Sequence, residues 1–160
     1  MEIYDEYRDK YNRLNASERD FLWAHPVAAV DFNFNASVAL KEAQKRFGAG
    51  SLHNGSGDAM RHCFWSTMNT RDQGKRLAKM FGDAHEAFDG NPSNEKAMDL
   101  HNNSVGYEIG VASPGASDRH LAVICVQAWT ARKLLQIDGV KSNDLIYSNS
   151  TENYIYGAHK

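Results

Sequence analysis

Apolar residues recur every three or four positions along most of this chain, which is the spacing of one face of an α-helix. Strict alternation of apolar and polar residues, which indicates a strand, is scarce. Residues 1–14 predict a short N-terminal helical extension. A second short helix is predicted to end at Ala24, with Ser17 and Asp20 forming its N-terminal cap.

A longer helix is predicted between Pro26 and Gly48, because proline favours the first turn of a helix and glycine favours its C-terminal cap. The stripe predicted to face the core comprises Val27, Val30, Phe34, Val38 and Ala39. The glycine-rich run 48–57 is predicted to be a loop. It lacks the GK[ST] ending of a phosphate-binding P-loop.

Three more helices are predicted, with approximate ranges of 58–78, 92–110 and 117–137. Gly74 lies inside the first of them, where a glycine weakens or interrupts a helix. Residues 138–160 predict a polar C-terminal tail. The pattern therefore predicts an all-α protein, a single compact domain of five or six helices over residues 1–160.

Composition narrows the class of protein. The net charge is −2, so the chain carries no strong electrostatic footprint of a nucleic-acid-binding protein. No apolar run is long enough for a transmembrane segment, and the N-terminus lacks the apolar core of a secretory signal. We therefore expect the chain to be made in the cytoplasm without a cleaved signal, and to act there or be secreted or delivered into a target cell.

The two cysteines, Cys63 and Cys125, lie among apolar neighbours in predicted helices. They are interpreted as reduced core residues. The alternative is a disulfide, which requires the two helices to pack these residues together. No CxxC pair or Cys/His zinc-finger spacing is present.

The first group of candidate functional residues starts the 58–78 helix. Asp58 and His62 stand one above the other on a helix face, because they are four residues apart. This spacing suits chelation of a metal ion, and it also suits a carboxylate that orients a catalytic histidine. A capping or surface pair has the same spacing, so the pair alone leaves these alternatives open.

A second group is His85 with Glu86, near a predicted helix end. Such a pair offers a metal ligand and a general base. An exposed, charged helix end is the alternative.

A third group lies on the 92–110 helix. One face carries Asp99, Asn102 and Asn103, followed by Gly106 and Gly110, and His101 lies at its edge. Each glycine costs a helix about 1 kcal/mol relative to alanine. This cost predicts the close approach of another helix or of a ligand, and the adjacent asparagines are interpreted as buried hydrogen-bonding groups.

Four of the seven histidines fall at positions 53, 62, 85 and 101, each beside an acid, an amide or the glycine-rich loop. We expect the three groups to converge into one site. A divalent metal ion, with zinc as the first choice, is predicted to be held by Asp58, His62 and His85. The predicted catalytic residues are Glu86 or Asp99 as general base, His101, and Arg61, Asn102 and Asn103 as stabilisers of a developing oxyanion.

The runs HNGSGDAMRHCFW (53–65) and GDAHEAFDGNPSNEKAMDLHNNSVGYEIG (82–110) resemble an uncharacterised bacterial domain family. Its members occur alone and at the C-terminus of Rhs-type polymorphic toxins. The resemblance rests on the motifs DAxRHxxW, AHE and MDLHNNxVG, and it spans about Leu14 to Leu135. It implies an effector or toxin, with a cognate immunity protein and a secretion-system carrier as partners. It implies no particular reaction.

A weaker similarity links FGDAHEAF (81–88) to the GDxHxP segment of the zinc-dependent phospholipase C and single-strand nuclease superfamily. It carries over Asp83 and His85 as metal ligands. The chain departs from that pattern at Ala87 and Asp89, and it lacks the N-terminal tryptophan ligand. The similarity therefore implies a site of one or two metal ions instead of three.

The leading hypothesis is a metal-assisted hydrolase of a phosphodiester or related ester in lipid, cell-envelope or nucleic-acid material, acting as an antibacterial effector. One alternative is a peptidoglycan-cleaving enzyme that uses Asp, Glu and His for acid–base chemistry. The other is a non-catalytic binding or adaptor domain, in which the His/Asn cluster is a buried polar network.

Overall fold

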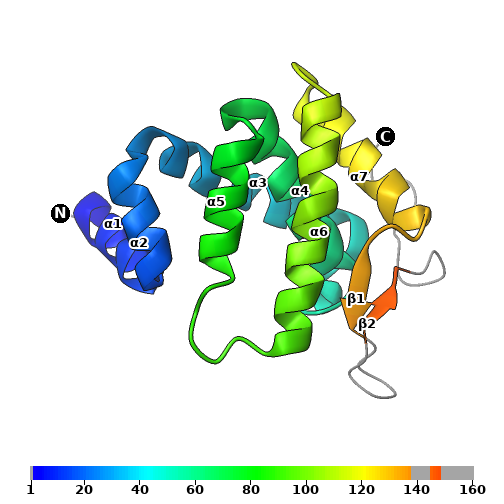
Figure 1. Cartoon of the computed structure of the whole chain (residues 1–160), viewed down its shortest axis with the longest axis horizontal. Coiled ribbons are helices and arrows are strands. Elements are labelled where there is room, and N and C mark those ends of the chain that lie inside the picture. Colours follow the sequence, from blue (N-terminus) through cyan, green and yellow to red (C-terminus); the bar gives the residue numbers. More distant parts are fainter. Residues whose placement is uncertain (1, 138–144, 149–160) are drawn as a thin grey trace.

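The computed structural model describes residues 2–137 and 145–148, with side chains from residue 8 onward. This part of the chain forms seven α-helices, one 3-10 turn and a small antiparallel sheet (Figure 1). The helices are α1 (Glu2–Arg13), α2 (Ala16–Ala24), α3 (Pro26–Phe47), α4 (Ser56–Gln73), α5 (Lys75–His85), α6 (Ser93–Ala112) and α7 (Asp118–Thr130). The 3-10 turn is η1 (Ala49–Ser51), and the strands are β1 (Leu135–Ile137) and β2 (Leu145–Tyr147). None of the described helices has both the length and the apolar character needed to cross a membrane.

The prediction of a mainly helical protein is confirmed, but the described residues hold one helix more than the upper estimate. The difference arises at Gly74, where φ is 82°. Glycine adopts this left-handed conformation without steric cost. The single helix predicted for 58–78 is therefore two, and α5 turns back to run beside α6 (Figure 1).

The last predicted helix is shorter than expected. Helix α7 ends at Thr130, and Arg132 has a positive φ of 57°, which takes the chain out of the helix. Residues Leu135–Ile137 then form β1, which pairs with β2. Strand β2 belongs to the predicted tail 138–160, which, apart from 145–148, lies outside the described residues.

The N-terminal cap of α2 is Asn15, not Ser17. The Asn15 side chain accepts a hydrogen bond from the Glu18 amide at 2.9 Å, and the Glu18 carboxylate accepts one from the Asn15 amide at 2.8 Å. This reciprocal capping box satisfies two donors at the start of the helix. The Asn15 side-chain amide also donates to the carbonyl of Ala84 at 2.8 Å, which ties α2 to the end of α5.

The stripe predicted to bury α3 is wrong for three of its five members. Val27, Val30 and Phe34 are between 65% and 73% exposed. The buried face instead carries Phe32 and a series of alanines. Two members of the predicted stripe belong to it: Ala39 is fully buried and Val38 is partly buried. Both stripes have helical periodicity, but small side chains let α3 pack closely on α4, so tertiary packing selects the alanine face.

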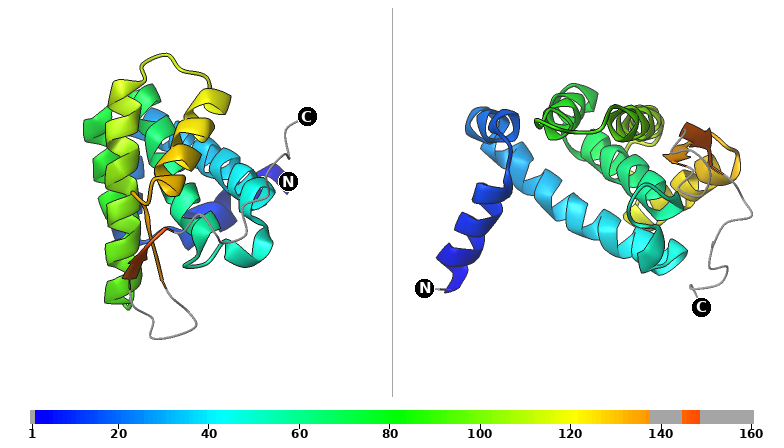
Figure 2. Two further views of the ribbon diagram at one scale, coloured as in Figure 1. Left: turned by 90° about the vertical axis from the view of Figure 1, so that its right-hand side faces the viewer. Right: turned by 90° about the horizontal axis from the view of Figure 1, so that it is seen from below.

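Helix α4 is the centre of the fold, because it packs against α3, α5, α6 and α7 (Figure 2). A Cβ atom on Gly106 of α6 would lie 2.3 Å from the carbonyl oxygen of Cys63, and one on Gly110 would lie 2.7 Å from that of Thr67. The close approach predicted from these glycines is thus a helix contact.

Cys63 and Cys125 are free and buried, as predicted.

Candidate metal centre

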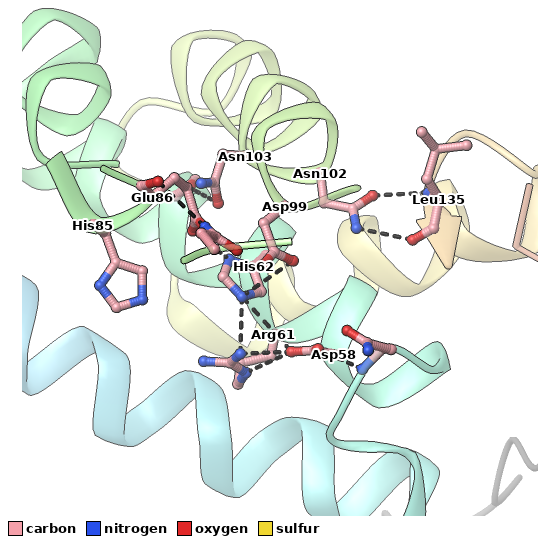
Figure 3. Close-up of polar contacts among 12 residues, drawn as sticks. Asp58, Arg61, His62, His85, Glu86, Asp99, Asn102, Asn103 and Leu135 are labelled. Atoms are coloured by element: carbon pink, nitrogen blue, oxygen red, sulfur yellow. Dashed lines mark hydrogen bonds and ion pairs between the residues drawn. The ribbon is translucent and has the colours of Figure 1, made fainter. Parts of the chain in front are cut away.

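Three of the predicted site residues meet where α4 and α6 pack together. The Nε2 atom of His62 lies 3.6 Å from an Asp58 oxygen and 3.4 Å from an Asp99 oxygen (Figure 3). One ligand atom from each residue lies within 4.8 Å of the others. This buried group could bind a metal ion, because imidazole nitrogen and carboxylate oxygen are ligands of zinc and similar divalent ions.

The local sequence places these ligands. Asp58 lies in the first turn of α4, and its Oδ2 atom accepts a hydrogen bond from the backbone amide of Asn54 at 2.7 Å. His62 follows one turn later on the same face. Asp99 comes from α6, and the contact at Gly106 brings that helix close enough for its carboxylate to reach His62.

The hydrogen bonds define the state of the His62 ring. Its Nε2 lies 2.8 Å from an Arg61 nitrogen, and a guanidinium only donates hydrogen bonds. Nε2 must therefore accept, and the ring proton is on Nδ1. Burial lowers the pKa of His62 well below its usual value, and the charge of Arg61 lowers it further. His62 is thus a neutral imidazole whose Nε2 accepts from Arg61 and lies near both aspartates, and neutral imidazole is the form that binds metals.

Asp99 is held in an unfavourable environment for a free carboxylate. Its Oδ1 atom is buried and has no hydrogen-bond partner among the described residues. Burial raises the pKa of Asp99 to about 8, and the charges of Asp58 and Glu86 add to the effect. Asp99 Oδ1 lies 3.4 Å from His62 Nε2, and a cation bound between them would stabilise the ionised form of this carboxyl group.

Glu86 lies on the other side of the His62 ring. One of its oxygens is 3.9 Å from His62 Nδ1, and the other accepts a hydrogen bond from the Asn91 side chain at 3.1 Å. Burial raises the pKa of Glu86. This position behind the ring suits a carboxylate that orients the histidine better than a general base at the metal ion.

His85, predicted as a metal ligand, lies outside the group of three. Its Nδ1 is 2.6 Å from an oxygen of Glu18, and its ring packs against Trp65. The ring centres of His85 and His62 are 6.3 Å apart. Sequence reasoning missed Glu18, because its place in the capping box of α2 gives no sign of a partner 67 residues away.

The remaining predicted residues divide between the site and the scaffold. Asn103 lies at the site, where it accepts a hydrogen bond from Ser66 at 2.8 Å. The Asn102 amide instead bonds both backbone polar groups of Leu135 and so holds β1 against α6 (Figure 3). His101 is also directed away, with Nε2 2.9 Å from the carbonyl of Lys133.

Two further residues singled out in the sequence lie apart from the group. His53 is exposed beside Asn54. Asp83, the other residue in the phospholipase-like segment, is paired with Lys79 at 2.7 Å on an exposed part of α5. The convergence expected from the sequence therefore holds for Asp58, His62 and Asp99, with Glu86 and Asn103 adjacent.

The fold and site define a helical protein with a buried Asp-His-Asp group between two central helices. A family model described as Domain of unknown function (DUF6973) matches residues 19–133, and the chain belongs to this family. The matched span contains every residue of the group and lies within the span expected from the motifs. No solved structure matches the chain.

The charge balance of the group gives a testable prediction for Asp99→Asn. Arg61 is a nearby positive charge for three acids, Asp58, Asp99 and Glu86. Replacing one of them by a neutral amide therefore reduces the repulsion among the carboxylates and the cost of burying charge in the metal-free protein. We expect the variant to gain roughly 1–2 kcal/mol in free energy of unfolding with a chelator present. It should also lose any stabilisation by Co²⁺ or Zn²⁺.

Urea unfolding with and without metal measures both effects. Asp83→Asn is the matched control, because it removes an exposed carboxylate from α5. A less stable Asp99→Asn protein in chelator, or an undiminished response to metal, would contradict this account of the site.

Proposed function

We propose that this protein is a metal-dependent hydrolase that cleaves a phosphodiester or a related ester. The supporting observation is that the neutral His62 nitrogen and the carboxylates of Asp58 and Asp99 converge in one buried group. Three protein ligands leave coordination positions for water and substrate, as in catalytic zinc sites. A divalent ion bound there would lower the pKa of its water and supply a hydroxide nucleophile near neutral pH.

The surroundings of the group support an anionic substrate. The Arg61 side chain beside the group is 31% exposed, and the Asp99 side chain is 14% exposed, so both are partly accessible to solvent. A guanidinium binds phosphate oxygens through two parallel hydrogen bonds. Arg61 is therefore the residue that would orient a phosphoryl group and stabilise charge that develops on it.

The alternative of a purely structural polar network is less well supported. In such a network buried polar atoms have partners, as the Asn102 amide does. Glu86 Oε1 and Asp99 Oδ1 are buried and have no hydrogen-bond partner among the described residues. Unpartnered carboxylate oxygens beside one histidine favour a site that binds a ligand.

The proposal is tested with chelator-stripped protein reloaded with Zn²⁺, Mn²⁺ or Co²⁺. We expect hydrolysis of bis(p-nitrophenyl) phosphate only after loading, and Asp83→Asn should behave as the parent protein does. Metal binding without hydrolysis of any ester offered would reject the reaction class. Absence of metal binding would reject the metal centre itself.

We also propose that the chain acts as an antibacterial effector, which its resemblance to toxin-associated domains supports. Expression in the cytoplasm or the periplasm of a test bacterium should be toxic in one compartment, and His62→Ala and Glu86→Ala should remove the toxicity. The sensitive compartment separates cytosolic from envelope substrates, and a cognate immunity protein should suppress the effect. Growth unaffected in both compartments would contradict the effector role.

A further inference from the structure

The Arg61 guanidinium donates hydrogen bonds to two of the three candidate metal ligands, Asp58 and His62. One of its terminal nitrogens is 2.5 Å from Asp58 Oδ1 and 2.8 Å from His62 Nε2, and its Nε is 3.1 Å from the same Asp58 oxygen (Figure 3). The lone pair that would coordinate a metal ion is thus already engaged by an arginine N–H.

The two interactions exclude each other at His62. A neutral imidazole has one free nitrogen lone pair, which either accepts a hydrogen bond or coordinates a metal ion. A metal ion at this nitrogen would sit about 2.0–2.1 Å from it. That position is closer than the arginine nitrogen is now, so the guanidinium has to leave when the ion binds.

We propose that Arg61 takes the place of the cation in the metal-free protein, and that metal binding releases its guanidinium to hold the anionic phosphoryl group of the substrate. The inference rests on the proposed function and assigns a regulatory step to the same site. Metal loading and binding of a phosphate diester are then coupled through one side chain.

The surroundings of Arg61 permit this exchange. Its side chain is partly exposed on a long, flexible stem, whereas those of Asp58 and His62 are 5% and 2% exposed. Asp58 keeps its orientation when the arginine leaves, because its other oxygen is held by the Asn54 amide. The buried carboxylate is balanced in both states, by the guanidinium without metal and by the ion with it.

The exchange predicts two effects of opposite sign for Arg61→Gln. Removing the competing cation should tighten metal binding by about tenfold or more, because the ion no longer has to displace the charge-assisted hydrogen bonds of the guanidinium. Binding of a phosphate diester to the metal-loaded protein should weaken by about tenfold or more. An arginine that only supported the fold would not raise metal affinity when removed.

Two measurements on the full chain test the inference. Calorimetric titration of chelator-stripped protein with Co²⁺ gives the metal affinity. Paramagnetic broadening of the ³¹P signal of dimethyl phosphate by the Co²⁺-loaded protein reports diester binding. Arg71→Gln is the matched control, because Arg71 is also paired with carboxylates, those of Asp72 and Asp118, and lies outside the site.

We expect Arg61→Gln to bind Co²⁺ more tightly and to broaden the dimethyl phosphate signal less than the parent protein, while Arg71→Gln leaves both unchanged. Arg61→Met, which retains the apolar stem, replaces the glutamine variant if that protein does not fold. Metal affinity that is unchanged or lower in the folded Arg61 variant overturns the exchange while leaving the metal centre intact. A parent protein that binds no Co²⁺ overturns both the exchange and the proposed function.

Discussion

Replacing His62 with alanine is expected to weaken binding of Co²⁺ and Zn²⁺ by more than about 100-fold and to abolish metal-dependent hydrolysis. His62 contributes the only nitrogen ligand of the group and lies between the two carboxylates. Substitution of groups that merely orient metal ligands already costs about 10–100-fold in affinity. Loss of the ligand itself should therefore cost more.

Calorimetric titration of stripped protein measures this loss, and His101→Ala is the matched control. His101 is also a histidine of the predicted set, but its ring bonds the carbonyl of Lys133 outside the group. Because His62 is buried, His62→Gln should be measured alongside it to separate the lost ligand from a packing defect. Parent-like Co²⁺ affinity in a folded His62 variant would show that the ion binds elsewhere.

The second large effect is expected for Gly106→Ala. The added methyl carbon would lie 2.3 Å from the carbonyl oxygen of Cys63 and 2.9 Å from the Cβ of Ser66. Helix α6 would have to move away from α4, which we expect to lower the free energy of unfolding by about 2–3 kcal/mol, even though alanine itself favours a helix. Metal affinity should fall as well, because Asp99 moves with α6.

Urea unfolding and Co²⁺ titration measure the two consequences. Gly50→Ala is the control, since a Cβ atom there meets no described atom within 4 Å and its φ is not positive. If the unfolding free energy of Gly106→Ala is within about 0.5 kcal/mol of that of the parent, α4 and α6 can move apart at little cost in stability. Asp99 would then be placed by something other than this contact.

Local patterns in the sequence predicted most of the helices and two of the three candidate ligands, but they did not predict α5 as a separate helix and they extended α7 too far. Asp58 and His62 share one helix, so their separation follows from the helical repeat alone. The glycines of α6 predicted the close approach of another helix or of a ligand, because glycine destabilises a helix relative to alanine. The family match over 19–133 agrees with the span that the motifs suggested.

The tertiary structure decided which faces of the helices pack against one another. Asp99 is the third candidate ligand because α6 lies against α4 at the position that Gly106 permits, whereas His85 at the end of α5 is paired with Glu18. The periodicity of α3 was compatible with two buried faces, and packing on α4 chose the one with alanines.

The sequence by itself determined which residues lie on the same helical face, since that depends only on the geometry of one turn. The tertiary structure alone decided that Asp99 reaches His62 and that Glu86 lies behind the His62 ring. Those relations depend on rotamers, burial and the spacing between helices. No local periodicity encodes these properties.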